Sequence, residues 1–236
     1  MNIIKLATLV VLIWLICVIT HKSKFVNYID PKTVELHPLL EGTQMSKYLK
    51  KHQNKLTEMF KEFIDICNNN DIEYIVIGGT LIGALRHKGW IPWDDDIDVA
   101  MFEDNQTKIA NIYRNDPFLR QKYNVVTLSD VHVWINLYKI ISKADPKCFI
   151  DIFLLKENGI GSNKYGYMSY KGYRPTTDID NILPTKNAVF EEIPVKIPNN
   201  PLKLLRQLRF QSSGTPDINK LPAVEKRRPH HASFYQ

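Results

Sequence analysis

Residues 75–101 constrain the fold of this chain more than any other segment, and they read IVIGGTLIGALRHKGWIPWDDDIDVAM. An apolar run enters the pair Gly78 and Gly79, where the chain can turn tightly. The pattern predicts a short helix over 80–85 and a strand over 97–102. Four carboxylates fall within the five positions 94–98, and they repel one another unless they are solvated or share a cation. The apolar flanks argue against a solvated loop, so the segment predicts a metal-dependent site that handles phosphate.

The rest of the chain alternates helical and extended patterns, which predicts an α/β fold, that is, an α+β arrangement with a mixed sheet and an active face at strand ends. Residues 157–181 are rich in Gly, Asn, Tyr and Thr, so we expect a surface loop there. The further elements that we expect are a helix over 44–68, a strand over 72–77, a helix over 105–113 with Asp104 or Asn105 as its N-cap, strands over 125–128, 131–141 and 148–155, a hairpin over 188–197 and a helix over 201–210.

Composition excludes several classes of protein. The net charge is +6, but no long basic stripe carries interleaved aromatic residues, so no nucleic-acid partner is expected. The three cysteines, Cys17, Cys67 and Cys148, have no close ligand spacing, which argues against a zinc site. Free thiols in the core are the favoured interpretation, and a disulfide between Cys67 and Cys148 is the alternative.

The N-terminus carries an uncharged run over residues 6–20, flanked by basic residues. With Ile3 and Ile4 it approaches the length needed to span a bilayer, and no pair of small residues marks a cleavage site. We therefore expect an uncleaved signal anchor, a transmembrane helix within residues 1–24, rather than a cleaved signal peptide. This predicts a single-pass membrane protein with a lumenal or external catalytic domain. Residues 25–44 would form a stem, 45–210 the domain, and 211–236 a disordered basic tail.

The acidic segment has the composition of a divalent-cation site. In an extended strand Asp96 and Asp98 point to one side, and Asp94 continues the row if the strand begins that early. Hard carboxylate oxygens suit Mg²⁺ or Mn²⁺, which also bind the phosphates of a substrate. We therefore predict a cation held by Asp94, Asp96 and Asp98.

Asp151 is the third catalytic candidate. It is a lone carboxylate in the apolar run CFIDIFLL, where it is costly unless it is paired or bound to a metal. A neighbouring strand would bring it to the same cation or let it act as a general base on an acceptor hydroxyl. The structural alternative is a salt bridge to Lys139 or Arg86.

Basic and glycine-rich positions nearby are candidates for binding a diphosphate. Gly78 and Gly79 permit close approach of the backbone to phosphate, and Thr80 begins a helix whose N-terminal amides favour an anion. Arg86, His87 and Lys88 form a basic turn, which either clamps a diphosphate or is simply solvated. Trp93 either packs the loop or stacks on a base.

Together these residues resemble the LicD/fukutin-related family. The resemblance rests on GTLIG at 79–83, on Arg86 and on IPWDDDID at 91–98, with weaker support from YKI at 138–140, FIDIF at 149–153, Phe190 and PNN at 198–200.

This resemblance implies a nucleotidyltransferase-like fold and a specific chemistry. A substituted phosphate group, of the phosphocholine or ribitol phosphate type, would pass from a CDP-linked donor to a hydroxyl of a carbohydrate or glycoconjugate acceptor, and CMP would leave. By the same resemblance Asp96 and Asp98 hold Mg²⁺ or Mn²⁺ on the diphosphate, and Asp151 completes the site. Gly78, Gly79 and Arg86 would contact the donor. Lys139 is also predicted to bind the donor.

Two other classes of function use similar residues. A nucleotide-sugar glycosyltransferase also carries a short Asp-x-Asp on a membrane-anchored domain, but it would not need a glycine pair so shortly before Asp96. A non-catalytic protein that binds a cation and a nucleotide is the alternative outside the enzymes.

Overall fold

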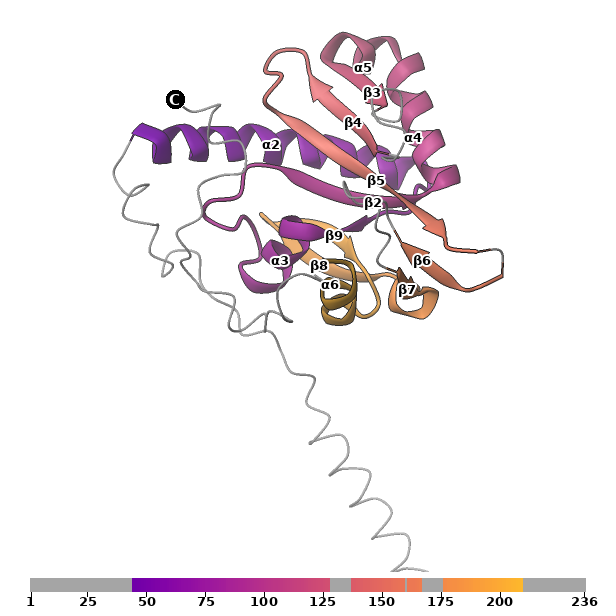
Figure 1. Cartoon of the computed structure of the whole chain (residues 1–236). Helices are drawn as coiled ribbons and strands as arrows, with labels where there is room; N and C mark the ends of the chain where they lie inside the picture. The colour runs from indigo at the N-terminus through magenta and orange to yellow at the C-terminus, as the bar shows by residue number, and fades with distance from the viewer. Residues whose placement is uncertain (1–43, 128–136, 160, 167–175, 210–236) are drawn as a thin grey trace, which may run out of the picture.

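A computed structural model describes residues 44–127, 137–159, 161–166 and 176–209 of the chain (Figure 1). Its centre is a seven-stranded sheet in which β2 and β5 pair in parallel, and every other pairing among the described strands is antiparallel. The main order is β1-β2-β5-β4-β3, and β6 and β7 extend from β5. The predicted mixed α/β fold is confirmed. The strands are β1 (Ile75–Val76), β2 (Ile97–Phe102), β3 (Tyr123–Thr127), β4 (Leu137–Ser142), β5 (Phe149–Glu157), β6 (Lys164–Gly166) and β7 (Thr176–Asp178).

The two parallel strands lie at the centre because their sequences are apolar on both faces. Ile97, Val99 and Met101 in β2 are fully buried, and Ile150 and Ile152 in β5 are almost as inaccessible. Strands that are covered on both sides lack the alternation of half-exposed strands and read as nearly continuous apolar runs. The carboxylates Asp98 and Asp151 interrupt these runs, which places both acids against the core.

Helix α2 (Gln44–Asn69) packs along the domain through an apolar stripe, as its periodicity predicts. Phe60 and Phe63 are fully buried. The ring of Phe60 meets that of Phe190 edge-on at 5.9 Å, and Phe63 meets Tyr74 in the same way at 5.9 Å. One face of α2 therefore contacts the start of the sheet and the later part of the chain.

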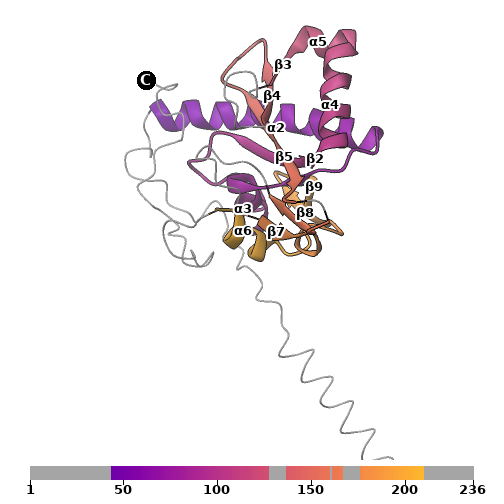
Figure 2. The ribbon, with the colours of Figure 1, turned by 45° about the vertical axis from the view of Figure 1, so that its right-hand side comes forward.

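The other elements form two groups, which lie on opposite sides of α2 in both views (Figures 1 and 2). One group is α4 (Glu103–Asn115), α5 (Pro117–Lys122) and β3. The other group is α3 (Gly78–Arg86), which carries the predicted donor-binding residues of the glycine segment, the hairpin of β8 (Lys186–Phe190) and β9 (Ile193–Ile197), and α6 (Pro201–Arg209). A 3-10 turn, η2 (Ile179–Asn181), precedes the hairpin.

Several predicted boundaries are wrong for identifiable reasons. The first strand is only two residues long, because the left-handed Gly78, with φ +56°, turns the chain directly into α3. Helix α4 begins at Glu103 after Phe102, rather than after Asp104 or Asn105. Acidic residues in its first turn favour this earlier start.

Other elements were not predicted at all. Helix α5 is one of them, although the Asp116 side chain accepts hydrogen bonds from the amides of Phe118 and Leu119, and Pro117 follows it as the first helical residue. The expected surface loop over 157–181 contains β6 and β7, which pair with the end of β5 and with each other. Strands β6 and β7 are only three residues long, which is too short for an alternating pattern to stand out in the sequence.

Cys67 and Cys148 are free and buried, so the favoured prediction of core thiols is confirmed. The predicted anchor (1–24), the stem (25–44) except for its last residue, and the tail (211–236) lie outside the described residues. Within the described ranges, no helix combines the length and the apolar character needed to cross a membrane.

Candidate active site

Three neighbouring strands bring together residues that are far apart in the sequence. Asp98 of β2 pairs in parallel register with Asp151 of β5, and Lys139 of β4 is the antiparallel partner of Asp151. The Lys139 ammonium lies 2.8 Å from a carboxylate oxygen of Asp151, with the two side chains 19% and 13% exposed. The structural alternative for Asp151, a salt bridge to Lys139 or Arg86, is therefore realised with Lys139. The register also places Asp98 and Asp151 side by side on one face of the sheet.

The other acidic residues lie in the loop that precedes β2. The strand begins at Ile97, so the condition under which Asp94 would continue a strand row is not met, and the prediction that Asp96 lies in the strand with Asp98 is wrong. The amide of Asp94 donates to the carbonyl of Ile91, 2.9 Å away, which bends the backbone into a turn. In this turn one carboxylate oxygen from each of Asp94, Asp95 and Asp96 lies within 4.8 Å of the others. Sequence reasoning missed Asp95, because strand alternation would have pointed it to the opposite face.

Asp98 carries the electrostatic signature of the site. Burial raises the pKa of its carboxyl group well above the usual range, and the charges of Asp96, Asp151 and Asp94 raise it further, while Lys139 opposes them. The cluster therefore holds more negative charge than one lysine balances. Several hard oxygen ligands with this excess charge fit Mg²⁺ or Mn²⁺.

The glycine pair lies directly against two of these carboxylates. A Cβ on Gly78 would lie 2.6 Å from Asp98 Oδ2, and a Cβ on Gly79 would lie 2.4 Å from Asp94 Oδ2. The next residue, Thr80, accepts a 2.9 Å hydrogen bond from the Asp98 amide through its hydroxyl oxygen. The start of α3 thus leaves room for the acidic cluster and ties it to β2. The predicted contact of these three residues with a donor phosphate stays a prediction.

The basic turn differs from a solvated turn and from a simple cationic clamp. Arg86 and His87 are buried, and Arg86 Nε donates to His87 Nδ1 at 3.3 Å. Burial and the charge of Arg86 lower the pKa of His87 to about 4, so the ring is neutral near pH 7. His87 therefore cannot supply the positive charge expected of it. Arg86 and the exposed Lys88 stay predicted donor ligands.

The tip of the β8–β9 hairpin supports this turn from outside the motif. Glu191 accepts a 3.1 Å hydrogen bond from the Trp90 amide, and its own amide donates to the Lys88 carbonyl at 2.8 Å. The rings of Trp90 and Phe190 meet at 5.2 Å. Sequence analysis did not identify Glu191. Its φ of +49° belongs to the tight turn of the hairpin and marks no function in the sequence.

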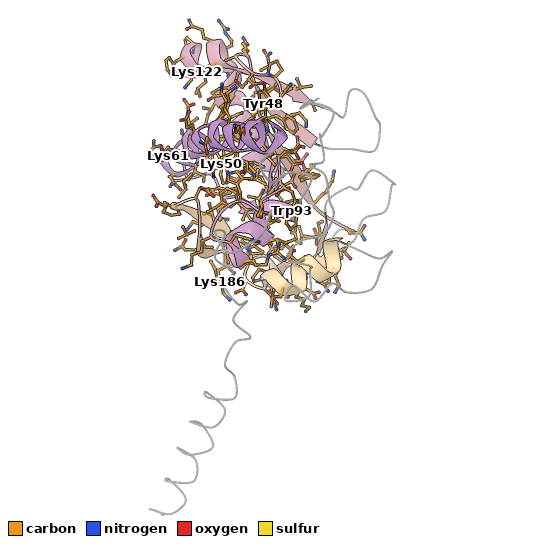
Figure 3. All side chains as sticks on the ribbon, turned by 90° about the vertical axis from the view of Figure 1, so that its left-hand side faces the viewer. Tyr48, Lys50, Lys61, Trp93, Lys122 and Lys186 are labelled. Atoms are coloured by element: carbon orange, nitrogen blue, oxygen red, sulfur yellow. The ribbon has the colours of Figure 1, made fainter. Side chains whose placement is uncertain are left out.

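Trp93 lies at the same end of the sheet. Its side chain is half-buried, and it appears between α2 and α6 when the molecule is viewed from that end (Figure 3). This position fits both predicted roles, packing of the loop and contact with a base. The two roles stay predictions.

The fold and the site define a mixed α/β domain with a carboxylate cluster at the amino ends of two parallel strands. The family model described as LicD/FKTN/FKRP, nucleotidyltransferase domain, matches residues 71–200, which is more than half of the chain. The chain belongs to this family. The matched region runs from the turn before β1 to the end of the β8–β9 hairpin and contains all the predicted site residues.

Individual relatives match this chain over different lengths and at different levels of identity. The lipopolysaccharide cholinephosphotransferase LicD of Haemophilus influenzae is 39% identical over 83 residues, which are 35% of this chain and 31% of that protein. An uncharacterised protein of Rickettsia typhi is 26% identical over 188 residues, 78% of this chain and 52% of the relative. The chain thus spans between about a third and half of the length of these curated relatives. Among solved structures, a lincomycin-bound lincosamide antibiotic adenylyltransferase aligns with a TM-score of 0.40 at 14% identity, covering 70% of this chain and 92% of that one.

Proposed function

We propose that the domain transfers a substituted phosphate group from a CDP-linked donor to a hydroxyl group of a glycan and releases CMP. Membership of the LicD/FKTN/FKRP family supports a transferase of this class. The similarity to a lipopolysaccharide cholinephosphotransferase supports phosphocholine as the group, and ribitol phosphate is the other candidate. In this proposal the apolar segment within residues 1–24 holds the domain at a membrane, on its lumenal or external side.

The observation that carries the proposal is the register of Asp98 against Asp151 beside the acidic loop. Neither acid of the sheet lies in a solvated turn, and the loop carboxylates crowd into the same region. Such a concentration of charge is costly to keep in the core unless function requires it. Asp94, Asp96 and Asp98 would hold Mg²⁺ or Mn²⁺, with Asp151 as a further ligand or as the base. The cation would supply positive charge that offsets the developing charge on the phosphate oxygens.

The chain's own residues would act on both substrates. In the transfer, the acceptor oxygen forms a bond to the phosphorus that bears the head group, and the bond from that phosphorus to the oxygen of CMP breaks. The proton of the acceptor hydroxyl passes to a base, for which Asp151 is the candidate. Lys139 offsets part of the charge of Asp151. The guanidinium of Arg86 would bind the diphosphate.

The test compares Asp98→Asn with Asp65→Asn in the full-length chain, purified in mild detergent. Asp65 is an exposed acid on α2 and serves as the matched control. We expect Asp98→Asn to release CMP from CDP-choline more than about 100-fold more slowly than the wild type. Loss of a residue that only orients a metal ligand lowers activity by about 10- to 100-fold, and loss of the ligand itself should lower it further. Its melting temperature should not fall, because the substitution removes repulsion from the apo protein.

The donor and the reaction class are tested by measuring both CMP release and nucleotide binding with the wild-type chain. Mn²⁺-dependent release of CMP from CDP-choline or CDP-ribitol, with a suitable glycan acceptor, would support the proposal. Binding of UDP or GDP in preference to the cytidine nucleotides would refute it in favour of a glycosyltransferase. Binding of Mn²⁺ and CDP-choline without any turnover would point to a non-catalytic protein.

A further inference from the structure

Two adjacent residues of α2, which lie outside the acidic motif, hold the backbone of the acidic loop. The side-chain amide of Gln53 donates to the Asp94 carbonyl at 2.8 Å and more weakly to the Ile91 carbonyl at 3.4 Å. The His52 ring nitrogen Nε2 lies 2.9 Å from the Asp95 carbonyl. Both side chains are buried, with 6% of His52 and 3% of Gln53 exposed. The residues lie about 40 positions before the loop, so these contacts depend on the tertiary fold.

The same histidine reaches the strand that carries Asp151. Its Nδ1 atom lies 3.6 Å from the thiol sulfur of Cys148, the residue directly before β5. A carbonyl can only accept, so Nε2 must carry a proton. In the tautomer that donates from Nε2, the lone pair of Nδ1 faces the Cys148 thiol. Burial raises the pKa of Cys148 to about 11, which keeps the thiol protonated and able to donate.

These contacts fix the geometry on which the carboxylates depend. Each peptide unit is planar, so a chain segment changes direction only through φ and ψ. Holding the carbonyls of Asp94 and Asp95 fixes two successive peptide planes, and with them φ and ψ of Asp95. The side chains of Asp94 and Asp96 leave the backbone on either side of this fixed unit. Thr57, one turn further along α2, is a third residue of this helix in contact with the segment before β2, because its hydroxyl accepts from the indole Nε1 of Trp90 at 2.9 Å.

We infer that His52 and Gln53 are positioning residues, which hold the acidic loop and the Asp151 strand at the separation that cation binding requires. The inference rests on the proposed function for its purpose, because the cation belongs to that proposal. The hold on the loop itself is a property of the folded chain and can be measured without any cation. If these buried side chains served only the stability of the fold, replacing them would change the free energy of unfolding and leave the cation affinity of the folded protein unchanged.

The test uses Gln53→Met in the full-length chain, which keeps the shape of the side chain and removes its donors. Phe63→Leu is the control, because Phe63 lies on the same helix and packs against the rings of Phe60 and Tyr74. Hydrogen–deuterium exchange of the peptide that covers residues 90–98 reports the hold on the loop. Calorimetric titration with MnCl₂ alone reports the site.

We expect exchange of the loop amides to rise about tenfold in Gln53→Met, whereas Phe63→Leu changes the loop no more than the rest of the domain. The Mn²⁺ dissociation constant should rise about tenfold in Gln53→Met and stay at the wild-type value in Phe63→Leu. His52→Leu should behave like Gln53→Met. His52→Gln, which keeps an N–H donor for the Asp95 carbonyl, should restore most of the loop protection.

Each result decides the inference. Unchanged loop exchange in Gln53→Met overturns it, and so does faster exchange with unchanged Mn²⁺ affinity. If the wild-type chain binds no Mn²⁺, the proposed cation site fails and the positioning role falls with it. In that case the exchange measurement still shows whether α2 holds the loop, so the two failures can be told apart.

Discussion

Replacing Gly79 with alanine should weaken cation binding and leave the domain folded. The new Cβ would lie 2.4 Å from Asp94 Oδ2 and 3.1 Å from its Cγ. Non-bonded heavy atoms pack near 3.5 Å, so the carboxylate must retreat by about 1 Å. A metal ligand tolerates a displacement of only about 0.2 Å, and Asp94 would therefore leave the ligand set. We expect the Mn²⁺ dissociation constant to rise about 10- to 100-fold.

The stability of this variant should change little. Gly79 does not have a left-handed backbone, so alanine fits its conformation. Alanine is favoured over glycine inside a helix by up to about 1 kcal/mol. This gain offsets part of the cost of moving a single carboxylate. The free energy of unfolding should stay within about 1 kcal/mol of the wild-type value.

Gly83→Ala is the matched control, with the same substitution in the same helix. Its Cβ would lie 2.4 Å from the Gly89 carbonyl oxygen and 3.1 Å from a ring carbon of Phe190. A backbone carbonyl cannot swing away as a side chain can. We therefore expect a loss of about 1–3 kcal/mol in unfolding free energy, with unchanged Mn²⁺ affinity of the folded protein.

Calorimetric Mn²⁺ titration and chemical denaturation of both variants would test this contrast. Wild-type Mn²⁺ affinity in Gly79→Ala would show that Asp94 is not a ligand of the cation. Unfolding of Gly79→Ala as severe as that of Gly83→Ala would show that the Asp94 carboxylate is part of the rigid core.

Two further predictions concern charge. Because the pKa of His87 falls from 6.5 to about 4 on folding, the unfolded chain binds more protons between these values. Stability should therefore decrease as the pH falls from 6.5 towards 4, by at most about 3 kcal/mol, and His87→Gln should lose less over this range in denaturation curves; equal losses would contradict the assignment. Lys139→Met should cost about 2–3 kcal/mol, less than a fully buried pair, because the partners are 19% and 13% exposed. Added Mg²⁺ should raise its melting temperature more than that of the wild type, and a variant as stable as the wild type without Mg²⁺ would refute the role of Lys139 in balancing the cluster.

The sequence predicted the elements whose signals are local. The apolar stripe of α2, the strand β2 and the hairpin predicted over 188–197 follow from side-chain periodicity, because one face of each element must leave water. The segment 75–101 likewise identified the family, since its glycines and carboxylates lie close together in the chain. Asp96 and Asp98 were predicted from this segment, and Asp151 was added to the same site because it is a lone carboxylate in an apolar strand.

The tertiary structure decided which partners these residues meet. Strand register pairs Asp151 of β5 with Asp98 of β2 on one side and with Lys139 of β4 on the other. This register depends on how the whole sheet packs. The turn that gathers Asp95 into the cluster, and the burial that makes His87 neutral, also come from packing. Contacts from His52, Gln53 and Glu191 were not predicted, because they join segments that are distant in the chain and carry no shared motif. The local pattern determined which chemical groups are present, and long-range packing determined their distances and charges, because only the folded chain excludes water from between them.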